Sequence, residues 1–157
     1  MNTKNKKLKI AIAGLGFGKK VHLEALKESH YLTPVAIYHY EKAQKSILEK
    51  ETGLEFFHNW EDLVKSPEID GIIIATPPES RFKLAKQALE NNKNLLLEKP
   101  VSISSSEIEE LQRISLINNL SVCVDFEYRA VPLFLQTKKL IDENTLGEIY
   151  LVKLDWL

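Results

Sequence analysis

Apolar residues along this chain form short runs that are separated by longer amphipathic segments. The first run, LKIAIAG at residues 8–14, is rich in isoleucine and closed by a glycine, as is typical of a strand buried on both faces of a parallel sheet. Comparable runs follow at residues 34–40, 54–57, 69–78, 94–100 and 120–126. The chain is therefore expected to contain six strands before its final segment.

The segments between these runs carry apolar residues at the three- and four-residue spacing of helices. Helices are expected at residues 19–28, 41–51, 60–66, 79–91, 104–117 and 132–142. Gly53 is expected to end one helix and Asn59 to cap the next, while Ser104 and Glu107 have the spacing of a capping box. Because each crossover is long enough for a βαβ unit, the pattern predicts an α/β fold, a doubly wound (Rossmann) parallel sheet with helices on both faces.

The last segment, IYLVKLDWL at residues 149–157, alternates between apolar and polar positions in the manner of a strand. Tyr150, Val152, Leu154 and Trp156 share one face of it. An apolar strand without a neighbour is not stable in water. The segment is either an edge strand of the same sheet or, as we favour, the start of a second domain that is absent from this chain.

Composition narrows the class of protein. Hydrophobic residues make up 44% and charged residues 27% of the chain, and the formal net charge is −1, so no basic excess suggests a nucleic-acid partner. The apolar runs are far shorter than a membrane span, and the lysine-rich start lacks the apolar core of a signal peptide. Cys123 is the single cysteine, and the four histidines show no metal-ligand spacing with it. A cytoplasmic protein without a metal site or a membrane anchor is expected.

A glycine cluster, GLGFG at residues 14–18, follows the first expected strand and precedes the first expected helix. This is the context of the dinucleotide-binding fingerprint: Gly14 permits the tight turn, and Gly16 lets the backbone approach a pyrophosphate at the helix N-terminus. The third glycine of the fingerprint should fall at position 19, where the chain has Lys19, with Gly18 one place early. The alternative interpretation is a structural turn between two buried elements.

The second expected strand ends at Tyr38 and His39, where a dinucleotide-binding domain usually has an acid that reads the ribose. Glu41 comes slightly late for that role. The missing carboxylate weakens a strict preference for NAD, since His39 with Lys42 can instead meet the 2′-phosphate of NADP. The alternative is a surface aromatic pair at a strand end. The choice between NAD and NADP stays open.

Two further motifs, ATPPESR at 75–81 and LLLEKP at 95–100, complete a known pattern. With AGLGFGKKVHLEAL at 13–26 and VDFEYRAVP at 124–132, they occur in the order and spacing of the Gfo/Idh/MocA oxidoreductases. Over residues 7–157 the chain resembles the N-terminal, nucleotide-binding half of that family, which includes glucose-fructose oxidoreductase and inositol dehydrogenase.

The resemblance implies roles for particular residues. Thr76 and Pro77 match a turn that lies against the cofactor, and Arg129, with Tyr128, matches another. Lys99, in the E-K-P motif, corresponds to a catalytic lysine near the nicotinamide that helps to bind substrate and to transfer a proton. The candidate cofactor-binding residues are Gly14, Leu15, Gly16, Phe17, Gly18, Tyr38, His39, Thr76, Pro77, Glu98, Lys99 and Arg129.

The family's function is the oxidation or reduction of sugar-like or other small hydroxyl and carbonyl substrates with NAD(P). Its substrate pocket and its usual oligomer interface come from a C-terminal α/β domain, so this chain alone is expected to bind a dinucleotide and to turn over little or nothing. A non-catalytic NAD(P)-binding module or sensor is the alternative. We expect a disordered tail at 1–6, an NAD(P)-binding Rossmann domain at 7–127, a connecting turn and helix at 128–147, and the first strand of a truncated C-terminal domain at 148–157.

Overall fold

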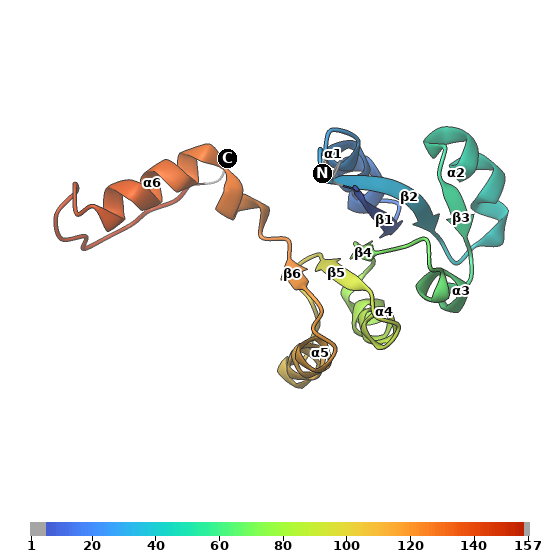
Figure 1. Ribbon diagram of the computed structural model, residues 1–157. Coiled ribbons are helices and arrows are strands. Elements are labelled where there is room, and N and C mark those ends of the chain that lie inside the picture. The colour runs from blue at the N-terminus through green and yellow to red at the C-terminus, as the bar shows by residue number, and fades with distance from the viewer. Residues whose placement is uncertain (1–5, 156–157) are drawn as a thin grey trace, which may run out of the picture. The chain divides into compact units, whose positions relative to one another are not determined.

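The computed structural model describes residues 6–155 of the chain, which divides into two compact units. The first unit ends at Asp125 and the second begins at Phe126. In the first unit, helices cover both faces of one sheet (Figure 1). One face carries α1 (Leu23–Lys27) and α2 (Lys45–Thr52), and the other carries α3 (Trp60–Lys65), α4 (Pro78–Glu90) and α5 (Ser105–Ile117). The expected doubly wound architecture is confirmed.

The sheet has six parallel strands in the order β3-β2-β1-β4-β5-β6. Their bounds are β1 (Leu8–Ala13), β2 (Leu32–Tyr38), β3 (Glu55–Phe57), β4 (Gly71–Ile74), β5 (Asn94–Leu97) and β6 (Val122–Val124). The chain builds outward from β1 in one direction and then returns to build outward from β4 in the other. The carboxyl ends of β1 and β4 therefore meet at the reversal of strand order, where open α/β sheets bind their ligands.

Successive side chains of β1 point to opposite faces of the sheet, and each face of the strand packs into a different core. Ile10 and Ile12 pack with Leu23 and Leu26 of the first helix, whereas Ala11 and Ala13 belong to the larger core on the opposite face. This larger core contains Ile72 and Ile74 and the apolar sides of α3, α4 and α5. Small residues on β1 leave room there for the bulkier side chains of these helices.

The helices of the first unit agree with the sequence pattern except at their ends. They are the π turn η1 (Gly18–His22) continued by α1 (Leu23–Lys27), the 3-10 turn η2 (Lys42–Gln44) continued by α2 (Lys45–Thr52), α3 (Trp60–Lys65), α4 (Pro78–Glu90) and α5 (Ser105–Ile117). Gly53 ends α2 with φ of 69°, and the Asn59 side chain caps α3 by accepting a hydrogen bond of 2.9 Å from the Glu61 N–H. Both of these cap predictions are confirmed.

The capping box predicted from Ser104 and Glu107 is wrong. Ser104 does precede α5, but its side chain makes no cap hydrogen bond and instead lies 2.8 Å from the Ser106 hydroxyl. The Glu107 carboxylate accepts a hydrogen bond from Ser102, two residues before the expected partner. The path of the loop before α5 brings the Ser102 hydroxyl, and not that of Ser104, to the Glu107 carboxylate.

The second unit contains the 3-10 turn η3 (Glu127–Ala130) and α6 (Pro132–Asp142), the helix that Pro132 was expected to begin. The strand expected over residues 149–157 is not formed in residues 149–155, and Trp156 and Leu157 lie outside the described residues. A strand requires a neighbour that takes its backbone hydrogen bonds, and among the described residues none pairs with this segment.

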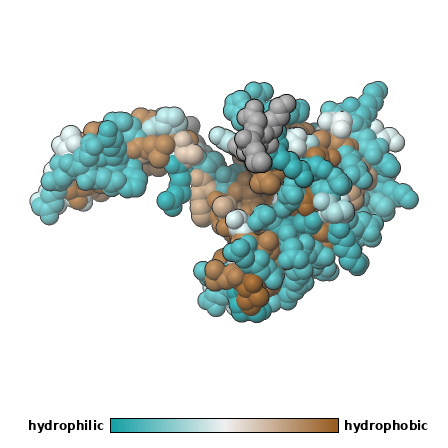
Figure 2. Space-filling view, viewed as in Figure 1, coloured by the Kyte–Doolittle hydropathy of each residue, from teal (hydrophilic) through white to brown (hydrophobic). Residues whose placement is uncertain are grey.

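Exposed apolar side chains occur on α5 and in the segment after α6, among other places. Figure 2 shows apolar surface over α5, where Ile108, Leu116 and Ile117 are exposed. The segment after α6 also exposes its apolar residues, Tyr150 and Leu151 among them. None of the helices in residues 6–155 has the length and hydropathy needed to cross a membrane.

Candidate functional site

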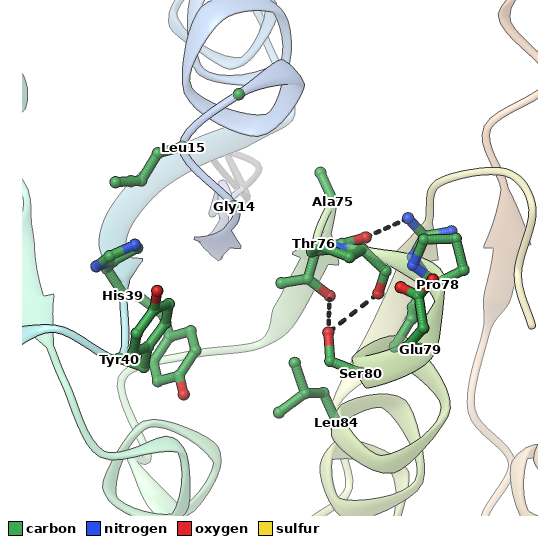
Figure 3. Close-up of a pocket in the computed structure, with 14 residues that line it drawn as sticks. Gly14, Leu15, His39, Tyr40, Ala75, Thr76, Pro78, Glu79, Ser80 and Leu84 are labelled. Atoms are coloured by element: carbon green, nitrogen blue, oxygen red, sulfur yellow. Dashed lines mark hydrogen bonds between the residues drawn. The ribbon is translucent and has the colours of Figure 1, made fainter.

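A cavity of about 790 Å³ opens at the carboxyl ends of β1, β2 and β4, within the volume range of small-molecule and cofactor sites (Figure 3). The close-up shows three walls: the glycine loop after β1, the aromatic side chains after β2, and the turn from β4 into α4. The lining residues are Gly14, Leu15, Gly16, Tyr38, His39, Tyr40, Ala75, Thr76, Pro77, Pro78, Glu79, Ser80, Arg81 and Leu84.

Gly14 and Gly16 serve different purposes in the loop. Gly14 has φ of 118°, and a Cβ there would lie 2.5 Å from the Ala75 carbonyl oxygen, so the fold itself requires glycine. At Gly16 a Cβ would meet nothing within 4 Å. Packing therefore does not demand glycine at position 16. The open space beside the Gly16 backbone is what close approach of a pyrophosphate requires.

Gly18 takes the place of the third glycine. A Cβ at Gly18 would lie 3.1 Å from Ile12 Cγ2 and 3.3 Å from Ala75 Cβ, so Gly18 lets η1 pack closely against the strands. The expectation that this position falls at residue 19 is corrected: Lys19 instead forms an ion pair with Glu51 of α2. The chain enters its first helix through a π turn that begins at Gly18, and this local geometry is not evident from the glycine spacing.

Aromatic rings form the wall after β2. The Tyr38 ring lies 4.9 Å from the Trp60 ring in an edge-to-face arrangement, and partial burial raises the pKa of the Tyr38 hydroxyl. The His39 and Tyr40 rings are 4.5 Å apart. His39 Nδ1 accepts a hydrogen bond of 3.2 Å from the Glu41 N–H, so a neutral His39 carries its proton on Nε2. Tyr40 is a lining residue that the sequence analysis did not identify.

The third wall is the double-proline turn. Pro77 precedes α4 and Pro78 occupies its first turn, where a missing N–H costs nothing. The Ser80 hydroxyl donates to the Pro77 carbonyl oxygen at 3.0 Å and lies 3.1 Å from Thr76 Oγ1. Thr76 and Pro77 were expected at the site, whereas Ser80 was missed. Its signal is its place within the ATPPESR motif, in the first turn of the helix α4.

Arg81 ties the ends of two strands together. Its side chain is 3% exposed, and its guanidinium donates hydrogen bonds to the carbonyl oxygens of Thr76, Glu98 and Pro100. Burial lowers the pKa of Arg81, and the nearby Glu98 carboxylate partly opposes that shift. The planar fork of arginine can serve several carbonyls at once. Arg81 therefore joins the T-P turn after β4 to the E-K-P segment after β5.

We predict that Arg81→Met lowers the free energy of unfolding by about 3 kcal/mol, because three carbonyl oxygens lose a charged donor. Urea denaturation of the 157-residue chain measures this change. Arg81→Lys should recover part of the loss, because one ammonium cannot reach all three oxygens. Arg113→Met, at an exposed position of α5, serves as the control. Equal stability of the Arg81 and Arg113 variants would contradict this role.

The E-K-P segment lies directly after β5. Glu98 is 7% exposed, and its Oε1 lies 2.8 Å from Nε2 of His22 in η1. Asp125 Oδ2 lies 3.6 Å from the same nitrogen, so among the described residues these three groups could also offer ligand atoms to a metal ion. Sequence spacing did not predict this cluster, since residues 22, 98 and 125 meet only through strand pairing.

Lys99 and Phe17 lie beside each other at the rim of this cluster. Lys99 is exposed, and its Nζ is 6.0 Å from the centroid of the Phe17 ring. The structure thus brings Phe17, Glu98 and Lys99 together, although none of them lines the cavity itself. Arg129 belongs to η3 in the second unit, and its role at the site stays a prediction.

The strand order, the glycine loop after β1 and the cavity at the reversal of strand order define a dinucleotide-binding Rossmann domain. The sequence model of the Gfo/Idh/MocA family, described as an oxidoreductase family with an NAD-binding Rossmann fold, matches residues 8–126. The chain belongs to this family.

Individual relatives agree with this assignment. The chain is 36% identical over 156 residues to an uncharacterised oxidoreductase of Synechocystis sp., which covers 99% of this chain and 42% of that protein. It is 30% identical over 145 residues to glucose-6-phosphate 3-dehydrogenase of Bacillus subtilis, covering 92% and 41%. The crystal structure of scyllo-inositol dehydrogenase from Lactobacillus casei with bound NAD(H) and scyllo-inositol superposes with a TM-score of 0.84 at 27% identity, covering 92% and 43%. The chain spans less than half the length of these relatives.

Proposed function

We propose that this chain binds NAD or NADP in the cavity at the ends of β1, β2 and β4, as the cofactor-binding half of an NAD(P)-dependent dehydrogenase or reductase. The substrate class is a sugar-like or other small hydroxyl or carbonyl compound. The observation that carries the proposal is the open space beside Gly16, which adjoins a cavity of about 790 Å³. These residues fit a dinucleotide, because a backbone without a Cβ can approach the diphosphate closely.

Each wall of the cavity has a proposed part in binding. The loop from Gly14 to Gly18 holds the diphosphate, with Leu15 and Phe17 as its side chains. Tyr38 and His39 meet the adenosine ribose, where the Nε2–H of His39 can donate to a ribose oxygen or a 2′-phosphate. Thr76 and Pro77 lie along the opposite wall. A bound nicotinamide dinucleotide supplies hydride transfer.

Lys99 is the proposed catalytic residue. Its ammonium group is exposed near the glycine loop, with the Phe17 ring 6.0 Å away. A cation at this place can stabilise the negative charge that develops on a substrate oxygen, or exchange a proton with it. Glu98 supports Lys99 from the buried side, and Arg129 completes the cofactor site by resemblance to the family.

The rest of the reaction requires groups beyond this cavity. We propose that residues 148–157 begin a second domain which supplies the substrate pocket and the oligomer interface, and that the 157-residue chain alone turns over little or nothing. Positioning of both reactants is a large part of catalysis. A cytoplasmic location is proposed from the single cysteine, with neither nucleic acid nor membrane as a partner.

The second candidate function is a non-catalytic NAD(P)-binding module or sensor. One observation favours it: every residue that lines the cavity falls between Gly14 and Leu84. The first unit therefore supplies all the residues that line this cavity. Turnover by a longer form that includes the remaining half would favour the enzyme, and binding without turnover in that form would favour the module.

Titration with NADH and NADPH tests the proposed function. Trp60 packs against Tyr38 at the cavity wall, so a bound reduced nicotinamide dinucleotide should quench tryptophan emission through energy transfer. Trp156→Phe leaves Trp60 as the sole tryptophan and isolates its signal. We expect saturable quenching by at least one of the two dinucleotides. No change with either one in the folded chain would reject the proposal.

A further inference from the structure

A buried polar pair connects the first helix to the segment that carries Lys99. His22 Nε2 lies 2.8 Å from Glu98 Oε1, and both residues are 7% exposed. Asp125 Oδ2 lies 3.6 Å from the same His22 nitrogen. Buried polar groups are costly unless they satisfy each other. The contact therefore fixes the relative positions of η1 and the end of β5.

Glu98 is held at every polar group it offers. Its N–H donates to the Ile74 carbonyl oxygen at 3.1 Å, and its own carbonyl oxygen accepts from Arg81. Its Oε2 accepts a hydrogen bond of 3.2 Å from the N–H of Lys99. With Oε1 bound to His22, the Glu98 carboxylate is held where its Oε2 accepts from the Lys99 N–H, on the same peptide group whose carbonyl oxygen Arg81 holds.

The glycine loop closes the arrangement from the other side. The Phe17 ring meets the His22 ring edge-to-face at 5.3 Å, and the Lys99 Nζ lies 6.0 Å from the same ring. Lys99 thus contacts the nucleotide loop through Phe17, and it is joined to the helix after that loop through Glu98 and His22.

We infer that the His22–Glu98 pair is a positioning device for Lys99, in which His22 holds the Glu98 carboxylate and Glu98 holds the Lys99 backbone. The inference rests on the proposed function, in which Lys99 is the catalytic group. His22 does not line the cavity, and it is linked to the Lys99 N–H through the Glu98 carboxylate, so we assign its effect on Lys99 to Glu98. A histidine that only filled the core would not affect the Lys99 N–H.

Amide hydrogen exchange, followed by NMR on the 157-residue chain without dinucleotide, tests the inference. His22→Leu should make the Lys99 amide exchange about tenfold faster, which corresponds to about 1.4 kcal/mol. The Ala75 amide, which donates to the Ala13 carbonyl oxygen at 2.7 Å, should keep its rate and reports on the sheet. His22→Gln can still donate to Glu98 and should restore slow exchange at Lys99. His30→Leu, at an exposed histidine, is the matched control.

Three results would overturn the inference. An unchanged Lys99 rate in folded His22→Leu would remove the link, and equal acceleration of Lys99 and Ala75 would reduce the pair to a support of the fold. Stoichiometric Zn²⁺ binding that His22→Leu abolishes would reassign the cluster to a metal site. If His22→Leu does not fold, His22→Asn, which is too short to reach Glu98, replaces it. Because no dinucleotide is present, failure of NAD(P)H to bind would reject the proposed function and leave this result standing.

Discussion

Gly16→Val should weaken the binding of NADH and NADPH by at least about 100-fold, or about 2.7 kcal/mol, while the chain keeps its fold. The valine side chain would enter the open space beside the backbone, where the diphosphate has to approach. Apart from the two neighbouring residues in the chain, no heavy atom lies within 4 Å of a Cβ at this position, so the fold has room for the added Cβ. Isothermal titration calorimetry measures the affinity, and thermal unfolding measures the fold.

Gly53→Ala provides the matched control for this experiment. Gly53 ends α2 with φ of 69°, and a Cβ there also meets nothing within 4 Å. The strained backbone should cost roughly 1 kcal/mol of stability. Dinucleotide affinity should stay unchanged, because Gly53 does not line the cavity. Wild-type affinity in Gly16→Val would instead show that the glycine loop does not hold the diphosphate, and the cofactor site would have to lie elsewhere.

Lys99→Ala should lower turnover by roughly 100- to 10,000-fold in a form that carries the remaining half of the protein, with a far smaller loss of cofactor affinity. The reason is that the ammonium interacts with charge that develops on the substrate oxygen in the transition state. Steady-state kinetics give the change in kcat, and titration with the dinucleotide gives the change in Kd.

Lys83→Ala is the control for the lysine, because Lys83 is exposed on α4 and does not line the cavity. It should leave both quantities near their wild-type values. Equal losses of turnover and of cofactor affinity in Lys99→Ala would assign Lys99 to binding and leave the chemistry without its proposed residue.

Local patterns predicted most of the fold because they report on local structure. The apolar runs identified six strands, and Gly53, Asn59 and Pro132 marked helix ends at which their backbone chemistry acts within a few residues. The capping-box prediction was wrong because local spacing alone does not show which of two serines reaches Glu107. Ser102 and Ser104 both lie close enough in the sequence to reach Glu107, and only the path of the loop selects between them.

The candidate site was also predicted only in part, namely where its residues belong to a sequence motif. Gly14 to Gly16, Tyr38, His39 and the T-P turn follow from motifs that lie at strand ends, and these residues do line one cavity. Tyr40 and Ser80 were missed because a motif does not indicate which neighbours turn inward. The different roles of Gly14, Gly16 and Gly18 depend on how close Ala75 and Ile12 lie, and the spacing of glycines carries no such information.

By itself the sequence determined the succession of strands and helices along the chain, the place of the glycine loop between the first strand and the first helix, and the family to which the motifs belong. Each of these depends on residues that are near one another in the chain. The tertiary structure alone decided that Arg81 joins the ends of β4 and β5, and that His22 meets Glu98 beside Lys99. These contacts arise because parallel pairing brings the ends of β1, β4 and β5 to one edge of the sheet, where residues distant in sequence become neighbours.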